Sequence, residues 1–324
     1  MHGPEISVVV PSHARPLRLR WLLHALEEQT LPRERWEAVV VHDSGEETER
    51  LLTEHPLARA GTLRHVRLPV DTGAPARQRN VGWREARAPL VAFTDDDCRP
   101  VPEWLERLLQ TAEKNPGAIV QGRTKPDPDE AEVMDWAPRA RSMDVDAPPV
   151  PQAQTCNILY PRAYLETIGG LEETFPYPAG EDWDLAVRAI KAGAGFVGAP
   201  EALVYHAVIT FSLLQQVRFN KRWQALALVL KRHPEQRAVL VHGLFWKKRH
   251  ALLLPAIAGV LLARRMPLAA LLAVPYARDA MPYHGGGKFG RVRAAVELGG
   301  RVVVDVSELG AMIRGSLRYR TLIL

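Results

Sequence analysis

Three consecutive carboxylates, Asp95, Asp96 and Asp97, follow the apolar run at 90–93. Carboxylates held this close repel one another unless a positive charge lies among them. Mg²⁺ and Mn²⁺ prefer oxygen ligands, and Mg²⁺ usually takes one or two carboxylates together with phosphate oxygens and water. We therefore expect the triplet to hold Mg²⁺ or Mn²⁺ against a diphosphate, where the metal would neutralise charge on a departing phosphate. An acidic loop in solvent is the alternative explanation.

A second acidic cluster, Glu181, Asp182 and Asp184, surrounds Trp183 where a helix is expected to begin. The helix dipole alone favours carboxylates in a first turn by about 0.3 to 1 kcal/mol each, which is a structural explanation. Together with the triplet, however, the cluster offers a general base for the proton of an attacking hydroxyl group. Asp182 is the predicted base, with Glu181 beside it. Trp183 either contacts a sugar ring or belongs to the core.

Further polar residues stand at positions where they could reach a nucleotide. Asp43 could accept a hydrogen bond from a nucleobase or only shape a turn, and His13 could lie against the base or be an ordinary loop residue. Arg77 and Arg79 could reach phosphates or ribose, and a solvated basic face is their alternative. His206, after an apolar run, is a candidate metal ligand, although a lone histidine is more often satisfied within the fold.

Apolar runs and helix signals alternate along the first third of the chain. Helices are expected after Pro16, near Glu46 and after Pro75. Short apolar runs predict buried strands at 5–10, 38–41, 64–68 and 90–93. This alternation predicts an α/β fold with a mostly parallel sheet and helices on both faces. Ligands of such sheets bind beyond the carboxyl ends of the strands, where most of these polar residues stand.

The region after the triplet is less regular. Residues 121–153 are rich in Pro and Asp without periodicity, which predicts a long mobile loop on the acceptor side of the site. A strand is expected at 157–160 and a helix at 162–168. The turn Gly169-Gly170 then precedes a helix that starts at about residue 180. Asn157, at the start of that strand, is a predicted acceptor contact.

Taken in order, these segments resemble the family 2 glycosyltransferases, which are inverting enzymes with the GT-A fold. The resemblance covers roughly residues 5–206, and the order and spacing of its parts are more specific than any one part. The segments that carry it are Val8-Val9-Val10-Pro11-Ser12-His13-Ala14-Arg15-Pro16, Gln29-Thr30-Leu31-Pro32, Val40-Val41-His42-Asp43-Ser44-Gly45, Ala76-Arg77-Gln78-Arg79-Asn80-Val81-Gly82, Asp95-Asp96-Asp97, Gly169-Gly170-Leu171 and Glu181-Asp182.

The resemblance implies the GT-A nucleotide-diphospho-sugar transferase fold and a metal-dependent, inverting, hexosyltransferase-type reaction. The donor would be a nucleotide-diphosphate sugar and the acceptor a hydroxyl group. It implies that Asp43 recognises the base, that Asp95 to Asp97 hold ribose and metal, and that Asp182 is the catalytic base. By role, the predicted residues are Asp182 and Glu181 for catalysis; Pro11, His13, Arg15, Asp43, Arg77, Arg79, Asn80, Asp95 and Asp96 for the nucleotide sugar; Asp96, Asp97 and His206 for the metal; and Asn157 and Trp183 for the acceptor.

The sequence departs from the family pattern at the donor base. His42 stands where an acidic residue is frequent, and His13 stands where an aromatic residue often stacks on the base. The base, the sugar and the acceptor are therefore not assigned. Processive members carry a Gln-x-x-Arg-Trp element, which the run from Gln216 to Trp223 does not match, so transfer of a single sugar is expected.

Charge is unevenly distributed along the 324 residues. Residues 211–324 hold 19 Lys and Arg against 5 Asp and Glu, whereas the remaining 23 of 42 basic and 32 of 37 acidic residues give residues 1–210 a balance of −9. We expect a GT-A domain at 1–210 and a basic helical region at 211–324. Cys98 and Cys156 are too few for a disulfide framework and the start lacks a secretory signal, which indicates a cytoplasmic protein.

Two apolar arms in the basic region, 251–263 and 266–277, flank Arg264 and Arg265. A single straight crossing of a bilayer would place both arginines near its centre, at about 2.5 to 3.5 kcal/mol each. Each arm alone is roughly 20 Å long against a hydrocarbon core of about 30 Å. An interfacial hairpin, a soluble helical pair and an oligomer contact all fit this pattern.

Basic residues next to these arms favour an anionic lipid surface. They are Lys247, Lys248, Arg249, Arg314, Arg318 and Arg320. We expect peripheral association with the inner face of the cell membrane. A glycan or lipid-linked glycan acceptor would follow, in the synthesis of a cell-envelope polysaccharide, a glycolipid or another glycoconjugate.

Other function classes fit the sequence less well. A sugar-nucleotide pyrophosphorylase or a dinucleotide dehydrogenase needs a Gly-rich phosphate loop after the first strand, and Pro11-Ser12-His13-Ala14-Arg15 supplies none. Nucleic-acid binding is disfavoured because the basic residues lie among apolar runs. A non-catalytic protein that binds a nucleotide sugar or scaffolds a membrane-associated complex stays open.

Overall fold

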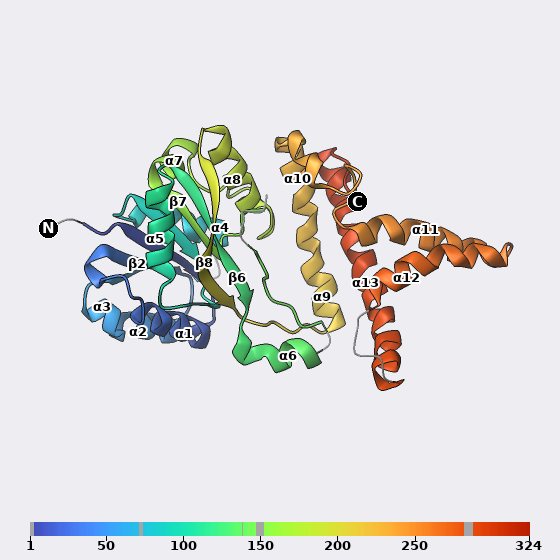
Figure 1. Cartoon of the computed structure of the whole chain (residues 1–324), viewed down its shortest axis with the longest axis horizontal. Coiled ribbons are helices and arrows are strands. Elements are labelled where there is room, and N and C mark those ends of the chain that lie inside the picture. The colour runs from blue at the N-terminus through green and yellow to red at the C-terminus, as the bar shows by residue number, and fades with distance from the viewer. Residues whose placement is uncertain (1–2, 71–73, 138, 147–151, 282–287) are drawn as a thin grey trace. The chain divides into compact units, whose positions relative to one another are not determined.

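The computed structural model describes residues 3–70, 74–137, 139–146, 152–281 and 288–324, which form two compact units (Figure 1). Unit 1 comprises Met1–Thr174 and Glu181–Ile209, and unit 2 comprises Phe175–Gly180 and Thr210–Leu324. The division after Ile209 lies beside the expected domain end at residue 210. The short segment 175–180, however, belongs to the second unit.

Unit 1 is built around an eight-stranded sheet with the order β3-β2-β1-β4-β7-β6-β8-β5. β1 is parallel to β2 and β4, β2 to β3, and β6 to β8, whereas β7 is antiparallel to β4 and β6, and β5 to β8. The predicted parallel arrangement is thus confirmed for the first four strands, and the other half is mixed. The strands are β1 (Ile6–Ser12), β2 (Trp36–His42), β3 (Leu63–Arg67), β4 (Leu90–Thr94), β5 (Cys98–Pro100), β6 (Ala118–Pro126), β7 (Asn157–Pro161) and β8 (Gly195–His206).

Helices cover both faces of this sheet, as predicted. Successive side chains of a strand point to opposite faces, so Val8 and Val10 of β1 pack with α1, α2 and α5, whereas Val9 packs with α4, α7 and α8. The helices of unit 1 are α1 (Pro16–Glu27), η1 (Arg33–Arg35), α2 (Glu46–Glu54), α3 (Pro56–Arg59), α4 (Pro75–Glu85), α5 (Trp104–Lys114), η2 (Pro128–Glu130), α6 (Ala131–Trp136), α7 (Arg162–Ile168) and α8 (Glu181–Lys191).

The prediction of an irregular loop at 121–153 is wrong for its first part. β6 continues to Pro126, because its polar residues pair along β8 after a register shift at Gly122 and Arg123. The short helices η2 and α6 follow. The rest of the predicted loop includes residues 138 and 147–151, which lie outside the described residues.

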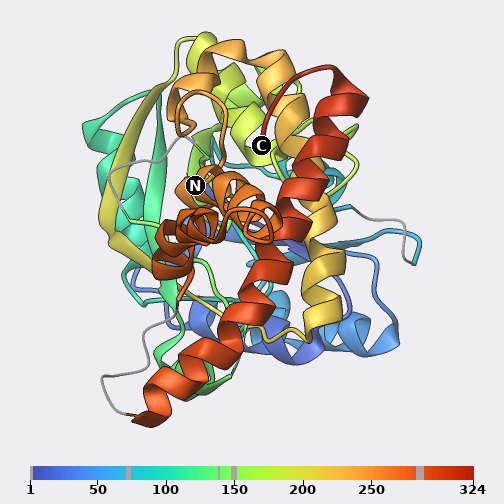
Figure 2. The same cartoon turned by 90° about the vertical axis from the view of Figure 1, so that its right-hand side faces the viewer.

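Unit 2 consists mainly of helices, and the longest helix among its described residues is α13 (Figure 2). Polar contacts tie α13 to earlier helices: Asn220 Nδ2 donates to Ser307 Oγ at 2.8 Å, and Lys247 Nζ donates to Glu308 Oε2 at 2.6 Å. The helices are α9 (Leu213–Phe219), η3 (Asn220–Gln224), α10 (Ala225–Arg232), η4 (Pro234–Val239), α11 (Lys248–Leu262), η5 (Pro267–Ala273), α12 (Val274–Ala280) and α13 (Lys288–Tyr319).

The two apolar arms of the sequence form a helical hairpin made of α11, η5 and α12 (Figure 1). Its inner side packs on α13 through Leu253, Tyr276 and Leu309, whereas Leu261 and Leu268 near the turn are 75% and 80% exposed. Among the helices in the described ranges, none has both the length and the apolar character that crossing a bilayer requires.

Candidate active site

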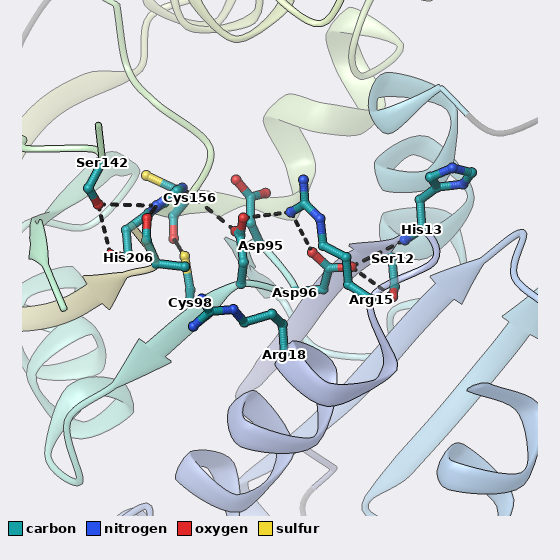
Figure 3. A network of polar contacts seen from close by, with 12 residues as sticks. Ser12, His13, Arg15, Arg18, Asp95, Asp96, Cys98, Ser142, Cys156 and His206 are labelled. Carbon is teal, nitrogen blue, oxygen red and sulfur yellow. Dashed lines mark hydrogen bonds and ion pairs between the residues drawn. The ribbon is translucent and has the colours of Figure 1, made fainter. Parts of the chain in front are cut away.

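The carboxyl ends of β1, β2 and β4 lie at one edge of the sheet in unit 1. Ser12 at the end of β1 is in register with His42 at the end of β2, and Val9 of β1 is in register with Phe93 of β4. The residues that follow these strands therefore meet, and they include Asp43 and the triplet at 95–97. Figure 3 shows His13, Arg15, Asp95 and Asp96 gathered at this edge.

Asp96 is the central carboxylate of this edge. It accepts hydrogen bonds from Ser12 Oγ at 2.9 Å and from the backbone N–H of His13 at 3.2 Å. Arg15 Nη1 lies 3.3 Å from Asp96 Oδ1 and 2.5 Å from Asp97 Oδ2, so one guanidinium group bridges two carboxylates. Burial, together with the neighbouring Asp97, raises the pKa of Asp96 to about 7. The carboxylate form thus needs additional positive charge at neutral pH, which a divalent cation would supply.

Asp97 and His206 form a pair whose donor atoms suit a metal ion. His206 Nδ1 lies 2.9 Å from the carbonyl oxygen of Ala207, which can only accept, so Nδ1 carries the proton of the neutral ring. His206 Nε2 then holds a lone pair, and it lies 3.6 Å from Asp97 Oδ1. Two acceptor atoms at this distance fit a shared cation. Burial raises the pKa of the adjacent Cys98 thiol well above its usual range.

Asp43 is buried beside the loop that follows β1. His13 Nδ1 lies 2.8 Å from Asp43 Oδ1, and Gln78 Nε2 of α4 donates to the same oxygen at 3.1 Å. Gln78 also donates to the carbonyl oxygen of Ser12 at 3.0 Å. The predicted base-binding residues Asp43 and His13 are therefore brought together, and Gln78 fixes both strand ends.

Arg79 connects the triplet with the second acidic cluster. Its guanidinium group pairs with Asp95, and its Nη1 lies 4.0 Å from Glu181 Oε1 at the start of α8. Arg79 Nε and Glu181 Oε2 are buried without a hydrogen-bond partner among the described residues. Burial raises the pKa of both Glu181 and Asp182. Arg79 thus connects the two predicted clusters, and two buried polar atoms between them remain able to form hydrogen bonds.

Four predicted contacts have other positions. Asn80 does not face the triplet, because its amide makes two 2.8 Å hydrogen bonds with the backbone of Leu171. Arg77 is exposed whereas Arg79 is buried, because residues two positions apart on a helix face different directions. Asn157 is fully buried and bonded to Trp104 and to backbone carbonyls, and Trp183 is 1% exposed. Three of these residues are therefore buried in the fold and Arg77 faces solvent, whereas contacts with the donor or the acceptor were predicted for all four.

The Gly169-Gly170 turn explains the position of Asn80. Gly170 has a φ of +79°, and a Cβ at this position would come within 2.4 Å of Asn80 Oδ1 and of Trp83 Nε1. Arg188 of α8 also donates to the carbonyl oxygen of Gly170, at 2.7 Å. The turn therefore fastens α4 to α8, the two helices that carry Arg79 and Asp182.

Comparison with known proteins identifies the family. The model of "Glycosyl transferase family 2" matches residues 7–169, which is half of the chain. The chain belongs to glycosyl transferase family 2. The matched region contains the ends of β1, β2 and β4, and it stops just before the acidic cluster of α8.

Named relatives and a solved structure are similar to this family 2 chain. An uncharacterized glycosyltransferase of Haemophilus influenzae is 34% identical over 34% of this chain and 35% of its own length. Glycosyltransferase AglE of Haloferax volcanii is 24% identical over 67% of this chain and 71% of its own length. The structure of mannosyltransferase PcManGT from Pyrobaculum calidifontis superposes with a TM-score of 0.62 at 20% identity, covering 95% and 88% of the two chains. The last similarity shows that the fold is GT-A.

Three residues of the family 2 site were not singled out from the sequence. Ser12 and Ser44 anchor the loop after β1, since Ser12 binds Asp96 and Ser44 Oγ accepts from the backbone N–H of Ala14 at 2.8 Å. Gln78 is the third. All three lie inside segments that carry the family resemblance. The motifs could therefore have indicated them, although a serine or a glutamine by itself does not indicate a functional site. Pro11 pairs with Val41 within the sheet and contributes its backbone to the strand end.

Proposed function

We propose that the protein transfers a single hexosyl group, with inversion at the anomeric carbon, from a nucleotide-diphosphate sugar to a hydroxyl group of an acceptor. The observation that carries this proposal is the convergence of the two acidic clusters on one sheet edge. His13 joins Asp43 to Asp96, and Arg79 joins Asp95 to Glu181. In a transfer reaction, one cluster would bind the donor and the other would act on the acceptor hydroxyl group, so both clusters must lie close to the same sugar.

The donor would lie along the ends of β1, β2 and β4. Asp43, fixed by His13 and Gln78, is placed to accept a hydrogen bond from a nucleobase. Arg15 is 47% exposed at its side chain, so its guanidinium group is able to reach both the triplet and a diphosphate in solvent. The similar structure of PcManGT holds GDP-mannose and Mn²⁺, which supports a nucleotide-sugar donor and a metal here.

Asp97 and His206, with Asp96 beside them, would hold Mg²⁺ or Mn²⁺. Their oxygen and nitrogen atoms suit either ion, and His206 Nε2 lies 3.6 Å from Asp97 Oδ1. When bound, the cation offsets the negative charge that develops on the nucleoside diphosphate. Arg15 would complement this charge from the solvent side.

Asp182 would take the proton of the acceptor hydroxyl group. The hydroxyl oxygen forms a bond to the anomeric carbon, the bond from that carbon to the phosphate oxygen breaks, and the proton passes to the Asp182 carboxylate. The backbone N–H of Trp183 donates to Asp182 Oδ1 at 2.8 Å, which orients the Asp182 carboxylate. Burial raises the pKa of Asp182 toward neutrality, where a general base is most effective.

The acceptor would be a glycan or a lipid-linked glycan presented at an anionic membrane surface, for cell-envelope or other glycoconjugate synthesis. The exposed leucines at the turn of the α11–η5 hairpin, with Arg264 and Arg265 exposed between them, support an anionic membrane surface, for which we propose the inner face of the cell membrane. A dimer contact through the same hairpin is the alternative, and sedimentation in the absence of lipid would reveal it.

The donor proposal is tested by calorimetry with a panel of nucleotide-diphosphate sugars, with and without Mn²⁺. We expect one of them to bind only with metal, and we expect the Asp97→Asn variant to weaken this binding at least tenfold. The exposed Asp129→Asn is the matched control, because Asp129 lies outside the site at 76% exposure. Tight donor binding without metal, or equal binding by Asp97→Asn, would contradict the metal role.

A nucleotide-sugar-binding protein without activity would pass this test, so turnover must be measured separately. Slow hydrolysis of the bound donor, lost in Asp182→Ala while donor binding persists, would distinguish an enzyme from a binder. A pyrophosphorylase would instead release a sugar phosphate when inorganic pyrophosphate is added.

A further inference from the structure

A second group of side chains that could hold a metal ion lies at the carboxyl end of β2, on the side of the neighbouring β3. His42 ends β2, His65 lies in the neighbouring β3, and Glu49 lies in α2, which follows the Asp43 loop. In the register of the sheet Val40 pairs with His65, so the two histidines come from adjacent strands and stand two positions apart. None of these three residues has a role in the proposed transfer reaction.

Four polar atoms of this group are buried and make no hydrogen bond among the described residues. His42 is 0% exposed, and neither of its ring nitrogens makes a hydrogen bond among the described residues. Glu49 Oε2 and His65 Nδ1 are also buried without a hydrogen-bond partner. Buried polar atoms are normally hydrogen-bonded, so four unsatisfied atoms in one place point to a ligand there.

The distances within the group suit a tetrahedral metal ion. His42 Nε2 lies 3.3 Å from Glu49 Oε2, His65 Nδ1 lies 3.8 Å from Glu49 Oε1, and one donor atom from each residue falls within 4.8 Å of the others. Ligands bound to Zn²⁺ at about 2.0–2.2 Å in tetrahedral geometry are roughly 3.3–3.6 Å apart. The two distances between histidine and glutamate atoms therefore lie in or near this range, and the group as a whole is compact enough for one ion.

We propose that His42, Glu49 and His65 bind a divalent cation of the Zn²⁺ class, at a site separate from Asp97 and His206. Two imidazoles and one carboxylate are a ligand set that Zn²⁺ accepts, with a water molecule in the fourth position. By contrast, the carboxylate-rich sheet edge suits Mg²⁺ or Mn²⁺. The cation would join β2, β3 and α2 around the loop that carries Asp43.

The surrounding charges are compatible with a cation at this site. Burial lowers the pKa of His42, which keeps the ring in the neutral form that binds metals. Arg67 Nη1 comes no nearer than 3.8 Å to Glu49 Oε2, and its side chain is 44% exposed, so it can turn to solvent. The buried Asp43 beside His42 adds negative charge.

A third group, His24, Glu27 and His55, is less suited to a metal and serves as a comparison. The backbone N–H of Leu57 donates to His55 Nδ1 at 3.3 Å, so the proton of the neutral ring is on Nε2. That nitrogen has no lone pair to offer, and His24 is exposed. We expect no specific zinc binding there.

The test is a Zn²⁺ titration of the full-length Asp97→Asn protein against a chromophoric chelator, with that substitution silencing the other metal site. One Zn²⁺ per chain should bind. Adding Glu49→Gln or His65→Ala should weaken it at least tenfold, whereas Glu46→Gln, an exposed position on the same helix, and His24→Ala should not. Circular dichroism of each metal-free variant checks the fold. Co²⁺ in place of Zn²⁺ should give the visible absorption of a tetrahedral site.

Equal zinc affinity in Glu49→Gln and His65→Ala, or its loss in His24→Ala, would overturn the proposal. A measurement on the unaltered protein needs no variant: crystals grown with Zn²⁺ should show anomalous scattering at the zinc edge between His42, Glu49 and His65. Its absence there, with zinc bound elsewhere, would equally reject the site. Neither result bears on donor binding, so this inference and the proposed function fail independently.

Discussion

The sheet edge of unit 1 and the hairpin turn of unit 2 depart from the usual distribution of side chains in opposite ways. In unit 1, Asp43, Arg79 and Asp96 are charged groups with at most 4% exposure, whereas in unit 2 Leu261 and Leu268 are apolar side chains with at least 75% exposure. Buried charge is unfavourable unless it is paired, and exposed apolar patches favour association. This contrast fits the proposal that the two units have different tasks, which are donor binding and transfer in unit 1 and attachment in unit 2.

This comparison predicts that variants will separate the two tasks. The largest effect is expected at the proposed base, because general base catalysis contributes about 10² to 10⁴ in rate. Asp182→Asn should lower kcat by that factor and leave donor affinity and liposome binding unchanged. Release of nucleoside diphosphate measures the rate, and Glu113→Gln on the exposed side of α5 is the control. A loss below fivefold would remove Asp182 from its assigned role.

The second effect concerns the turn that fastens α4 to α8. Gly170→Ala places a Cβ against Asn80 and Trp83 at a backbone φ of +79°, and should lower the free energy of unfolding of unit 1 by about 1–3 kcal/mol. Gly169→Ala is a matched control, since it has a φ of +78° and nothing within 4 Å of a Cβ. Urea unfolding compares the two. Equal losses would mean that backbone strain alone acts, without the packing against Asn80.

The fold of unit 1 could be predicted where the apolar runs were strong. The site could be predicted where polar residues directly follow these runs. The apolar runs of β1, β2 and β4 placed Asp43 and the triplet correctly at one edge. β6 was missed because its residues after Val120 are mostly polar and gain their order from pairing with β8, which is distant in sequence. Such non-local pairing has no signature in the segment itself.

The hydrogen bonds that hold some side chains within the fold could not be predicted from the sequence either. Asn80 and Asn157 have residue types that suit ligand contacts, but both amides are hydrogen-bonded within the fold, to backbone groups of distant segments and to tryptophan side chains. Their burial depends on the mixed half of the sheet and on the Gly170 turn. The cluster of His42, Glu49 and His65 escaped for the same reason, since three different elements bring its members together.

A third effect tests unit 2. Replacing Leu261 and Leu268 together with Ser should reduce binding to vesicles that contain anionic lipid by about tenfold or more, because burying a leucine side chain contributes about 1.5 to 3 kcal/mol. Transfer to a water-soluble acceptor should be unchanged. Leu17→Ser, an exposed position of unit 1, is the control in a flotation assay. Equal flotation of all three proteins would exclude the hairpin as an attachment surface.

The smallest effect is the pH dependence of turnover. Asp182 must be deprotonated to act as a base, and burial raises its pKa above that of a free carboxyl group, which is about 4. Activity should therefore fall on acidification with a midpoint clearly above pH 4, while vesicle binding stays constant over the same range. A midpoint at or below pH 4 would show that the base is a solvated group.

The central claim is that the carboxyl ends of β1, β2 and β4 hold a nucleoside diphosphate through a metal ion. Its most direct test is a crystal structure with Mn²⁺ and the donor selected by calorimetry, with the metal located by its anomalous scattering. We predict a Mn²⁺ ion bound by Asp97 and His206, with the base against Asp43 and the sugar facing Asp182. A nucleotide bound elsewhere on the protein, or a diphosphate bound at this edge without the metal, would contradict the account.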